Sequence, residues 1–308
     1  MIVITGATGN TGRPAVEALL ANGAKVRVIG RDAAKLEPQV SQGAEAFVGE
    51  AADVASMTRA FDGASAVYLV IPQARVEEPR AYQETVSDAY AAAVAAANVP
   101  YVVALSSVGA QHAEKTGFVA GLHSMEEKLN KIPGLNLLCL RPMQFMENLL
   151  MSIGPLRMLG SLAGAAPGDV AQQWIATSDV GWYAAKRLAA RDFSGSSVQE
   201  ISGPRDVSWK EIASIVGKAI GKPGLGYMQV PFMMLEPAFS QMGMPKKMAG
   251  LMVELLKAMN AGWLDPQQAR TPENTTPTTM EEFVETVFVP AYAGKASAAT
   301  PMATSQAT

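Results

Sequence analysis

Three glycines near the start of the chain have the spacing of a phosphate-binding turn. The pattern Gly6-x-x-Gly9-x-x-Gly12 follows an apolar segment, 2–5, and precedes a segment with helical periodicity, 11–22. In such a unit the first glycine permits a tight turn, the second lets backbone approach a pyrophosphate, and the third lets helix and strand pack closely. The helix N-terminus adds N–H groups and the positive end of its dipole. This predicts a dinucleotide site; the alternative is a glycine-rich turn without a nucleotide.

The residues after the second apolar segment indicate which dinucleotide would bind. NAD-binding folds usually place there an acidic residue that bonds the ribose 2′-hydroxyl, whereas this chain has Arg31, with Lys35 four residues later. A guanidinium suits a 2′-phosphate and can also stack on adenine. We therefore expect NADP(H) rather than NAD(H). The acidic neighbour Asp32 would weaken phosphate binding, and the alternative is that both basic side chains belong to a solvated face.

The elements that must position these residues follow from hydrophobic patterning. Short β-branched runs alternate with longer amphipathic segments, which predicts a parallel sheet covered by helices on both faces. The carboxyl ends of the strands then meet at one edge, where ligands bind. The expected strands are 2–5, 25–30, 44–48, 66–71, 101–106 and 135–140, and the expected helices are 11–22, 33–40, 54–61, 79–97 and 119–131.

Composition limits the class of protein. The chain has 308 residues, 49% hydrophobic and 17% charged, with a net charge of −3 and no basic stretch. This argues against a nucleic-acid groove and against wholesale disorder. We expect a cytoplasmic protein, since no signal peptide or membrane span is evident. The single cysteine, Cys139, is expected to be a small buried hydrophobic residue, and no residues have the spacing of a metal site.

The pattern changes after residue 142, where methionine becomes dense and strand signals become sparse. We expect an α/β fold: a doubly wound parallel-sheet Rossmann domain with a smaller, mostly helical C-terminal lobe. The nucleotide domain would span 1–150, with 176–205 returning to it. The lobe would comprise 151–175 and 206–290, followed by a flexible tail, 291–308.

Several motifs together resemble the NmrA-like branch of the atypical short-chain dehydrogenases/reductases. They are the glycine turn, the Arg31/Lys35 pair, segments 60–70 and 140–148, and Ser106-Ser107. The resemblance extends over about residues 1–290. It implies either an NAD(P)H-dependent reductase of quinones and aromatic dyes, of the quinone oxidoreductase or triphenylmethane reductase type, or an NADP(H)-sensing regulator with little catalytic activity.

The cofactor residues expected from pattern and resemblance lie in six segments. The family usually has Gly-Asp after the third strand, whereas this chain has Gly49-Glu50, and Glu50 can still contact adenine. The resemblance also places the loop containing Pro142 and Phe145 over the nicotinamide. The expected cofactor-binding set is Gly6, Thr8, Gly9, Asn10, Thr11, Gly12, Arg31, Lys35, Glu50, Ile71, Pro72, Ser106, Pro142 and Phe145.

The expected catalytic helix departs from the ordinary short-chain pattern because it lacks Tyr-x-x-x-Lys, which trades a proton with the substrate. His123 stands near the tyrosine position, followed by Glu127 and Lys128, similar to the His-x-x-x-Glu-Lys of quinone reductases. His123 can donate a proton, with Glu127 orienting the ring from the same helix face. The alternative is that His123 packs locally and Glu127 is solvated.

The remaining candidates border the place where hydride would be transferred. Either hydroxyl of Ser106 and Ser107, at the end of the fifth strand, can bond a substrate oxygen or close backbone groups. Met248, Met252 and Met259 would line a cleft for a flat substrate, cover a second subunit, or simply fill the core.

These features favour an NADPH-dependent reductase of a quinone-like or conjugated aromatic acceptor. The alternative is an NADP(H) sensor that engages a protein partner. We expect no nucleic-acid or membrane partner, and a monomer or homodimer.

Overall fold

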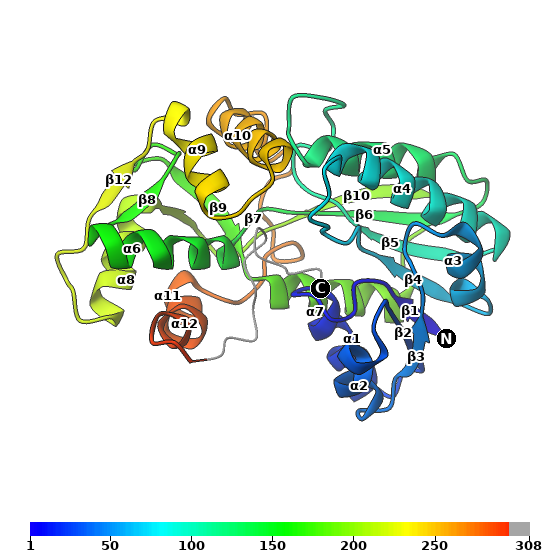
Figure 1. Cartoon of the computed structure of the whole chain (residues 1–308). Helices are drawn as coiled ribbons and strands as arrows, with labels where there is room; N and C mark the ends of the chain where they lie inside the picture. Colours follow the sequence, from blue (N-terminus) through cyan, green and yellow to red (C-terminus); the bar gives the residue numbers. More distant parts are fainter. Residues whose placement is uncertain (296–308) are drawn as a thin grey trace.

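The computed structural model describes residues 1–295 and is built around a seven-stranded parallel sheet (Figure 1). The strand order is β10-β6-β5-β4-β1-β2-β3. β2 and β3 lie on one side of β1, whereas β4 and the strands that follow lie on the other side, so the strand order switches between β1 and β4. Ligands bind at such a switch point in open α/β sheets. The strands are β1 (Ile2–Ile4), β2 (Val26–Gly30), β3 (Glu45–Val48), β4 (Ala66–Leu69), β5 (Tyr101–Leu105), β6 (Asn136–Pro142) and β10 (Ser196–Ile201).

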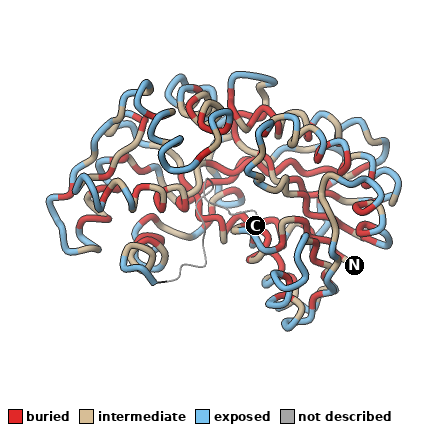
Figure 2. Tube along the Cα trace, in the orientation of Figure 1, coloured by how far each residue is buried: buried red, intermediate tan, exposed pale blue. Residues whose placement is uncertain are grey.

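Helices cover both faces of this sheet, α3, α4 and α5 on one side and α1, α2 and α7 on the other (Figure 1). Successive strand residues point to opposite faces, so β1 sends Val3 into one core and Ile4 into the other. Figure 2 shows the central strands as largely buried. The helices are α1 (Gly12–Ala21), α2 (Ala33–Val40), α3 (Val54–Phe61), α4 (Pro79–Ala96), α5 (Val119–Asn130) and α7 (Thr177–Ala190).

One buried ion pair joins the end of β6 to helix α5. Arg141 donates from Nη2 to Glu126 Oε2 at 2.6 Å and from Nε to Glu126 Oε1 at 2.9 Å. Both side chains are almost fully buried. The two-pronged geometry satisfies both charges and ties β6 to helix α5 immediately before the loop that follows the strand.

The second lobe combines helices with two small sheets, β11-β9-β7 and β12-β8. Its strands are β7 (Gln144–Phe145), β8 (Leu162–Gly164), β9 (Ala171–Ile175), β11 (Asp206–Ser208) and β12 (Tyr227–Gln229). Its helices are η1 (Met146–Ser152), α6 (Ile153–Leu159), α8 (Trp209–Ala219), α9 (Phe232–Gln241), α10 (Lys246–Asn260), α11 (Met280–Phe283), η2 (Val284–Phe288) and α12 (Val289–Tyr292).

The structure describes residues 291–295 of the predicted tail, 291–308. Helix α12 continues to Tyr292, whose ring stacks on Phe288 with a centroid separation of 6.4 Å. The guanidinium of Arg157 lies over the Tyr292 ring, 5.5 Å from its centroid. These contacts hold the segment on the lobe; the rest of the predicted tail, 296–308, lies outside the described residues.

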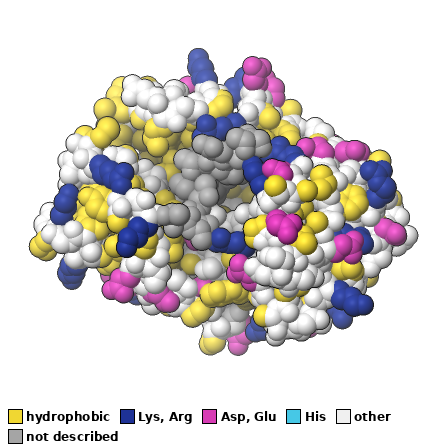
Figure 3. All heavy atoms as spheres, turned by 60° about the horizontal axis from the view of Figure 1, so that its bottom comes forward, with side chains coloured by type: hydrophobic (Ala, Val, Ile, Leu, Met, Phe, Trp, Pro, Cys, Tyr) yellow, Lys and Arg dark blue, Asp and Glu magenta, His cyan; other side chains and the backbone are white. Residues whose placement is uncertain are grey.

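The surface carries charged side chains of both signs. Basic and acidic side chains are interspersed on the face shown in Figure 3 rather than gathered by sign. Within residues 1–295, no helix is both long and apolar enough to cross a membrane. Cys139 is buried in the sheet, as predicted.

Candidate active site at the junction of the two lobes

A cavity of about 780 Å³ opens at the carboxyl ends of the central strands, and both lobes line it. The nucleotide domain contributes the glycine turn and the segments after β2, β4, β5 and β6, while helix α10 and the segment around β9 contribute the opposite wall. Thirteen of the fourteen predicted cofactor residues line this cavity; the exception is Gly12.

The glycine turn is shaped by three different constraints. Gly6 has a φ of +60°, a left-handed conformation that glycine adopts without strain. A Cβ on Gly12 would lie 2.1 Å from the carbonyl oxygen of Gly6, so helix α1 packs directly on the turn. A Cβ on Gly9 would meet only that same oxygen, at 3.2 Å. Gly12 is therefore required by packing, whereas the position of Gly9 leaves space for a ligand.

Two charged residues after β2 have separate tasks. The Asp32 carboxylate accepts a hydrogen bond from Ala34 N at 2.9 Å and caps helix α2. Arg31 is exposed, lines the cavity and makes no hydrogen bond or ion pair with other residues of 1–295. The conflict anticipated between Asp32 and a bound phosphate is thus reduced, because the carboxylate is engaged by the helix terminus.

Tyr82 of helix α4 also lines the cavity, although no sequence motif indicated it. Burial raises the pKa of the half-buried Tyr82, the negative charge of Glu50 adds to that rise, and the positive charge of Arg31 opposes it. Tyr82, Arg31 and Glu50 all line the same cavity. An aromatic ring and a guanidinium are both suited to stacking on a planar base.

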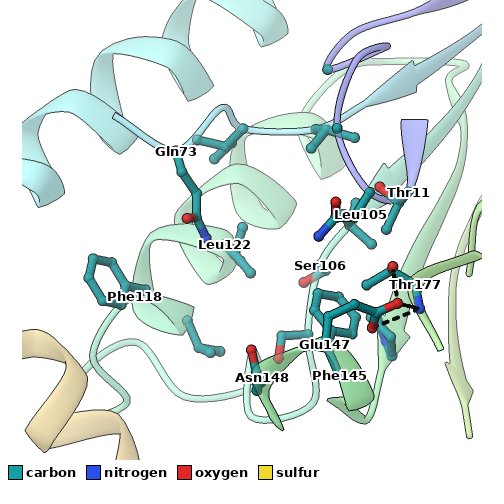
Figure 4. Close-up of a pocket in the computed structure, with 18 of the residues that line it drawn as sticks. Thr11, Gln73, Leu105, Ser106, Phe118, Leu122, Phe145, Glu147, Asn148 and Thr177 are labelled. Carbon is teal, nitrogen blue, oxygen red and sulfur yellow. Dashed lines mark hydrogen bonds between the residues drawn. The ribbon is translucent and has the colours of Figure 1, made fainter. Parts of the chain in front are cut away.

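The two serines after β5 differ in their hydrogen bonding. Ser107 Oγ donates to the carbonyl oxygen of Val108 at 2.9 Å. Ser106 Oγ is buried, lines the cavity and has no hydrogen-bond partner within residues 1–295. Buried hydroxyls are normally paired, so an unpaired one in a cavity wall indicates a place for a ligand. Ser106 is therefore the serine that can bond a substrate or cofactor atom (Figure 4).

The loop after β6 carries a buried carboxylate whose contacts the sequence did not reveal. Glu147 accepts hydrogen bonds from Thr177 N at 3.0 and 3.1 Å and from Thr177 Oγ1 at 2.5 Å (Figure 4). Burial raises the pKa of Glu147, and the bonds from Thr177 partly offset that rise. The pair fastens the loop to the first turn of α7, and both residues line the cavity.

The predicted catalytic pair on helix α5 lies outside the cavity wall. His123 Nδ1 is 2.8 Å from the carbonyl oxygen of Ala110, and Glu127 is exposed. The next residue, Lys128, pairs with Glu84 at 2.8 Å rather than with either of them. Their catalytic role stays a prediction.

The opposite wall of the cavity is largely apolar. Four methionines on or just before α10 line it, Met244, Met248, Met252 and Met259. Three of these are the methionines proposed from sequence for a cleft. Methionine is flexible and polarisable, so this wall can adapt to flat apolar groups. Phe118 and Leu122 of the nucleotide domain border the same space (Figure 4).

Within residues 1–295, no three His, Cys, Asp or Glu side chains are grouped so that they hold a metal ion.

Comparison with known proteins identifies one family across most of the chain. The model of the NmrA-like family matches residues 1–284. A characterised relative is the (4-alkanoyl-5-oxo-2,5-dihydrofuran-3-yl)methyl phosphate reductase of Streptomyces griseus subsp. griseus. It is 29% identical over 223 residues, which make up 72% of this chain and 75% of that protein.

Solved structures share the fold. A nucleoside-diphosphate-sugar epimerase from Staphylococcus aureus superposes with a TM-score of 0.79 and 19% identity, covering 92% of this chain and 99% of its own. The NADPH-dependent quinone oxidoreductase QOR2 of Escherichia coli, complexed with NADPH, gives 0.78 and 24%, covering 92% and 98%. The Citrobacter sp. triphenylmethane reductase, complexed with NADP(H), gives 0.74 and 17%, covering 92% and 99%.

Proposed function

This chain belongs to the NmrA-like family, and we propose that it is an NADPH-dependent reductase of a quinone-like or conjugated aromatic acceptor. The observation that carries the proposal is one continuous cavity with chemically different ends. One end has the glycine turn and Arg31, and the other has the methionine wall. Ser106 also lines the cavity, and within residues 1–295 neither the Arg31 guanidinium nor the Ser106 hydroxyl has a hydrogen-bond partner.

The residues present fit a dinucleotide phosphate. The space above Gly9 admits a pyrophosphate close to the backbone, and Arg31 can bind a 2′-phosphate, with Lys35 four residues later on α2. Tyr82 and Glu50 would border the adenine, while Ile71, Pro72, Pro142 and Phe145 would border the nicotinamide. The bound cofactor supplies the hydride, and the protein supplies orientation and electrostatics.

The chain's own residues would then position and shield the acceptor. Ser106 Oγ can donate a hydrogen bond to an acceptor oxygen, and Phe145 with the methionine wall keeps water from the reacting face. A quinone or conjugated dye accepts hydride without a strong acid beside it, which suits a chain without the Tyr-x-x-x-Lys pair. The role predicted for His123 and Glu127 is tested by His123→Ala: lost turnover with unchanged cofactor affinity would support it.

The test is NADPH oxidation at 340 nm with a panel of quinones, dyes and simple ketones, with NADH in parallel. Turnover of a quinone or dye but not of ketones is the expected result. Arg31→Ala should lower the preference for NADPH over NADH at least tenfold. A tenfold change corresponds to the loss of about 1.4 kcal/mol of binding free energy between the guanidinium and the 2′-phosphate. Tight NADPH binding without turnover of any acceptor would overturn the proposal and favour an NADP(H)-sensing protein.

A further inference from the structure

Charge is distributed unevenly along the cavity. Among residues 1–295, the only basic side chains in its wall are Arg31 and Lys35, both at the end assigned to the 2′-phosphate. Asp32 and Glu50 line the wall near these two cations. In the rest of the wall, the Lys, Arg, Asp and Glu residues that the structure describes are three acids, Glu147, Asp206 and Asp265. Within residues 1–295, the part of the cavity left for the acceptor therefore has no basic side chain in its wall.

The three acids differ in how far their charge is balanced. Asp206 pairs with Arg270, and Glu147 is held by Thr177. Asp265 is exposed and has no side-chain hydrogen bond or ion pair within 1–295. Its carboxylate is thus the least balanced charge facing the acceptor half.

Several basic residues adjoin the lining segments in sequence but are not part of the wall. Lys247, next to Met248, pairs with Glu78, and Arg141, next to Pro142, pairs with Glu126. Arg80 donates to the carbonyl oxygen of Gly117 at 3.1 Å and does not line the cavity. Arg75 is exposed on the loop after β4 and is also absent from the wall. An anionic group placed against the methionines would lose water without gaining a cation, which disfavours its binding.

We infer that the acceptor half of the cavity selects uncharged or cationic planar acceptors and rejects anionic ones such as phosphate esters and sulfonates. This inference rests on the proposed function and narrows its substrate class. It predicts an acceptor different from the phosphate ester that gives the Streptomyces griseus relative its name. Bound NADPH adds its own negative charge to the site and strengthens the discrimination.

The experiment compares two acceptors with the same ring system, 2-methyl-1,4-naphthoquinone and 1,4-naphthoquinone-2-sulfonate. We expect kcat/KM with NADPH at least tenfold lower for the sulfonate, although the sulfonate group makes the ring a stronger hydride acceptor. Binding of each quinone to the NADP⁺-loaded protein, measured by quenching of tryptophan fluorescence, should likewise be weaker for the sulfonate than for the methylated quinone.

A charge reversal at the rim tests the cause. At low ionic strength, Asp265→Lys should reduce the ratio of kcat/KM for the methylated quinone to kcat/KM for the sulfonate about threefold or more. Added salt should restore the wild-type ratio, because it screens the introduced charge. Glu285→Lys is the matched control, because Glu285 is exposed and outside the cavity wall; it should leave the ratio unchanged.

The outcomes separate this inference from the proposed function. Equal binding and equal kcat/KM for the two quinones would overturn charge selection while leaving the reductase in place. If neither quinone is reduced, the reductase is refuted for this acceptor class, and the binding ratio alone decides charge selection.

Discussion

Alanine substitutions at Gly9 and Gly12 should affect different properties, although both remove a glycine from the same turn: Gly12→Ala should lower stability, and Gly9→Ala should lower the affinity for NADPH. A methyl group on Gly12 would lie 2.1 Å from Gly6 O, 2.7 Å from Gly6 C and 3.0 Å from Ala7 Cα. All three are backbone atoms, which cannot rotate away as a flexible side chain can. The turn and helix α1 must therefore separate, with loss of packing across the sheet.

Gly12→Ala should accordingly be a stability variant. Forced overpacking costs typically about 1–3 kcal/mol, which corresponds to a fall in Tm of roughly 1.5–5 °C for a chain of 308 residues. Thermal unfolding of the ligand-free protein, followed by circular dichroism, measures it. An unchanged Tm would show that helix α1 does not need glycine at this position.

Gly9→Ala should instead be a binding variant. Its methyl group meets only Gly6 O, at 3.2 Å, so a shift of a few tenths of an ångström relieves the contact. The fold should lose less than about 1 kcal/mol, while the methyl group occupies the space proposed for the pyrophosphate. We expect the Kd for NADPH, measured by calorimetry, to rise at least tenfold with nearly unchanged Tm. Wild-type affinity in Gly9→Ala would refute the placement of the pyrophosphate over this residue.

Three further substitutions test the site and its supports. Ser106→Ala should lower kcat/KM for a quinone about tenfold, because a hydrogen bond to a developing charge is lost, whereas Ser107→Ala, whose hydroxyl bonds backbone, should change it less than about twofold. Glu126→Ala leaves Arg141 buried without its partner and should cost about 3–5 kcal/mol in chemical denaturation, whereas alanine at the adjacent exposed Glu127 should cost less than about 0.5 kcal/mol. The raised pKa of Glu147 means that this carboxyl favours folding while protonated and that the contribution is lost as the pH rises through its folded pKa. Glu147→Gln, which keeps an oxygen towards Thr177, should therefore be more stable than wild type near pH 8 and lose that advantage below about pH 4; the opposite order would refute the assigned shift.

The nucleotide domain could be predicted from sequence because its signals are local. The predicted helices 33–40 and 54–61 match α2 and α3, and the other strands and helices predicted in the first 150 residues begin and end within two residues of their expected positions. Long apolar runs and well-placed glycines define such elements without reference to the rest of the chain. The glycine turn and Arg31 were found for the same reason.

The second lobe was predicted less well because its sheets are built from short strands. β7 has only two residues and β8 only three, too few to show an alternating pattern. Their pairing partners are distant, since Gln144 pairs with Trp174 and Leu162 with Tyr227. The hydrogen bonds of Glu147 could not be predicted for a related reason, because its partner Thr177 is thirty residues away in sequence.

The two sides of the proposed acceptor site are held in different ways, and this difference bears on specificity. The loop after β6 is fastened at one end by Arg141 to Glu126 and at the other by Glu147 to Thr177, so Phe145 between them is carried on a rigid support. The facing wall consists of methionines on α10, whose side chains have many accessible conformations. A rigid face can hold the nicotinamide and acceptor at a fixed separation, while an adaptable face tolerates differences in ring size. It follows that substitutions in the methionine wall should change which acceptors are reduced, while the affinity for NADPH stays as in the wild type.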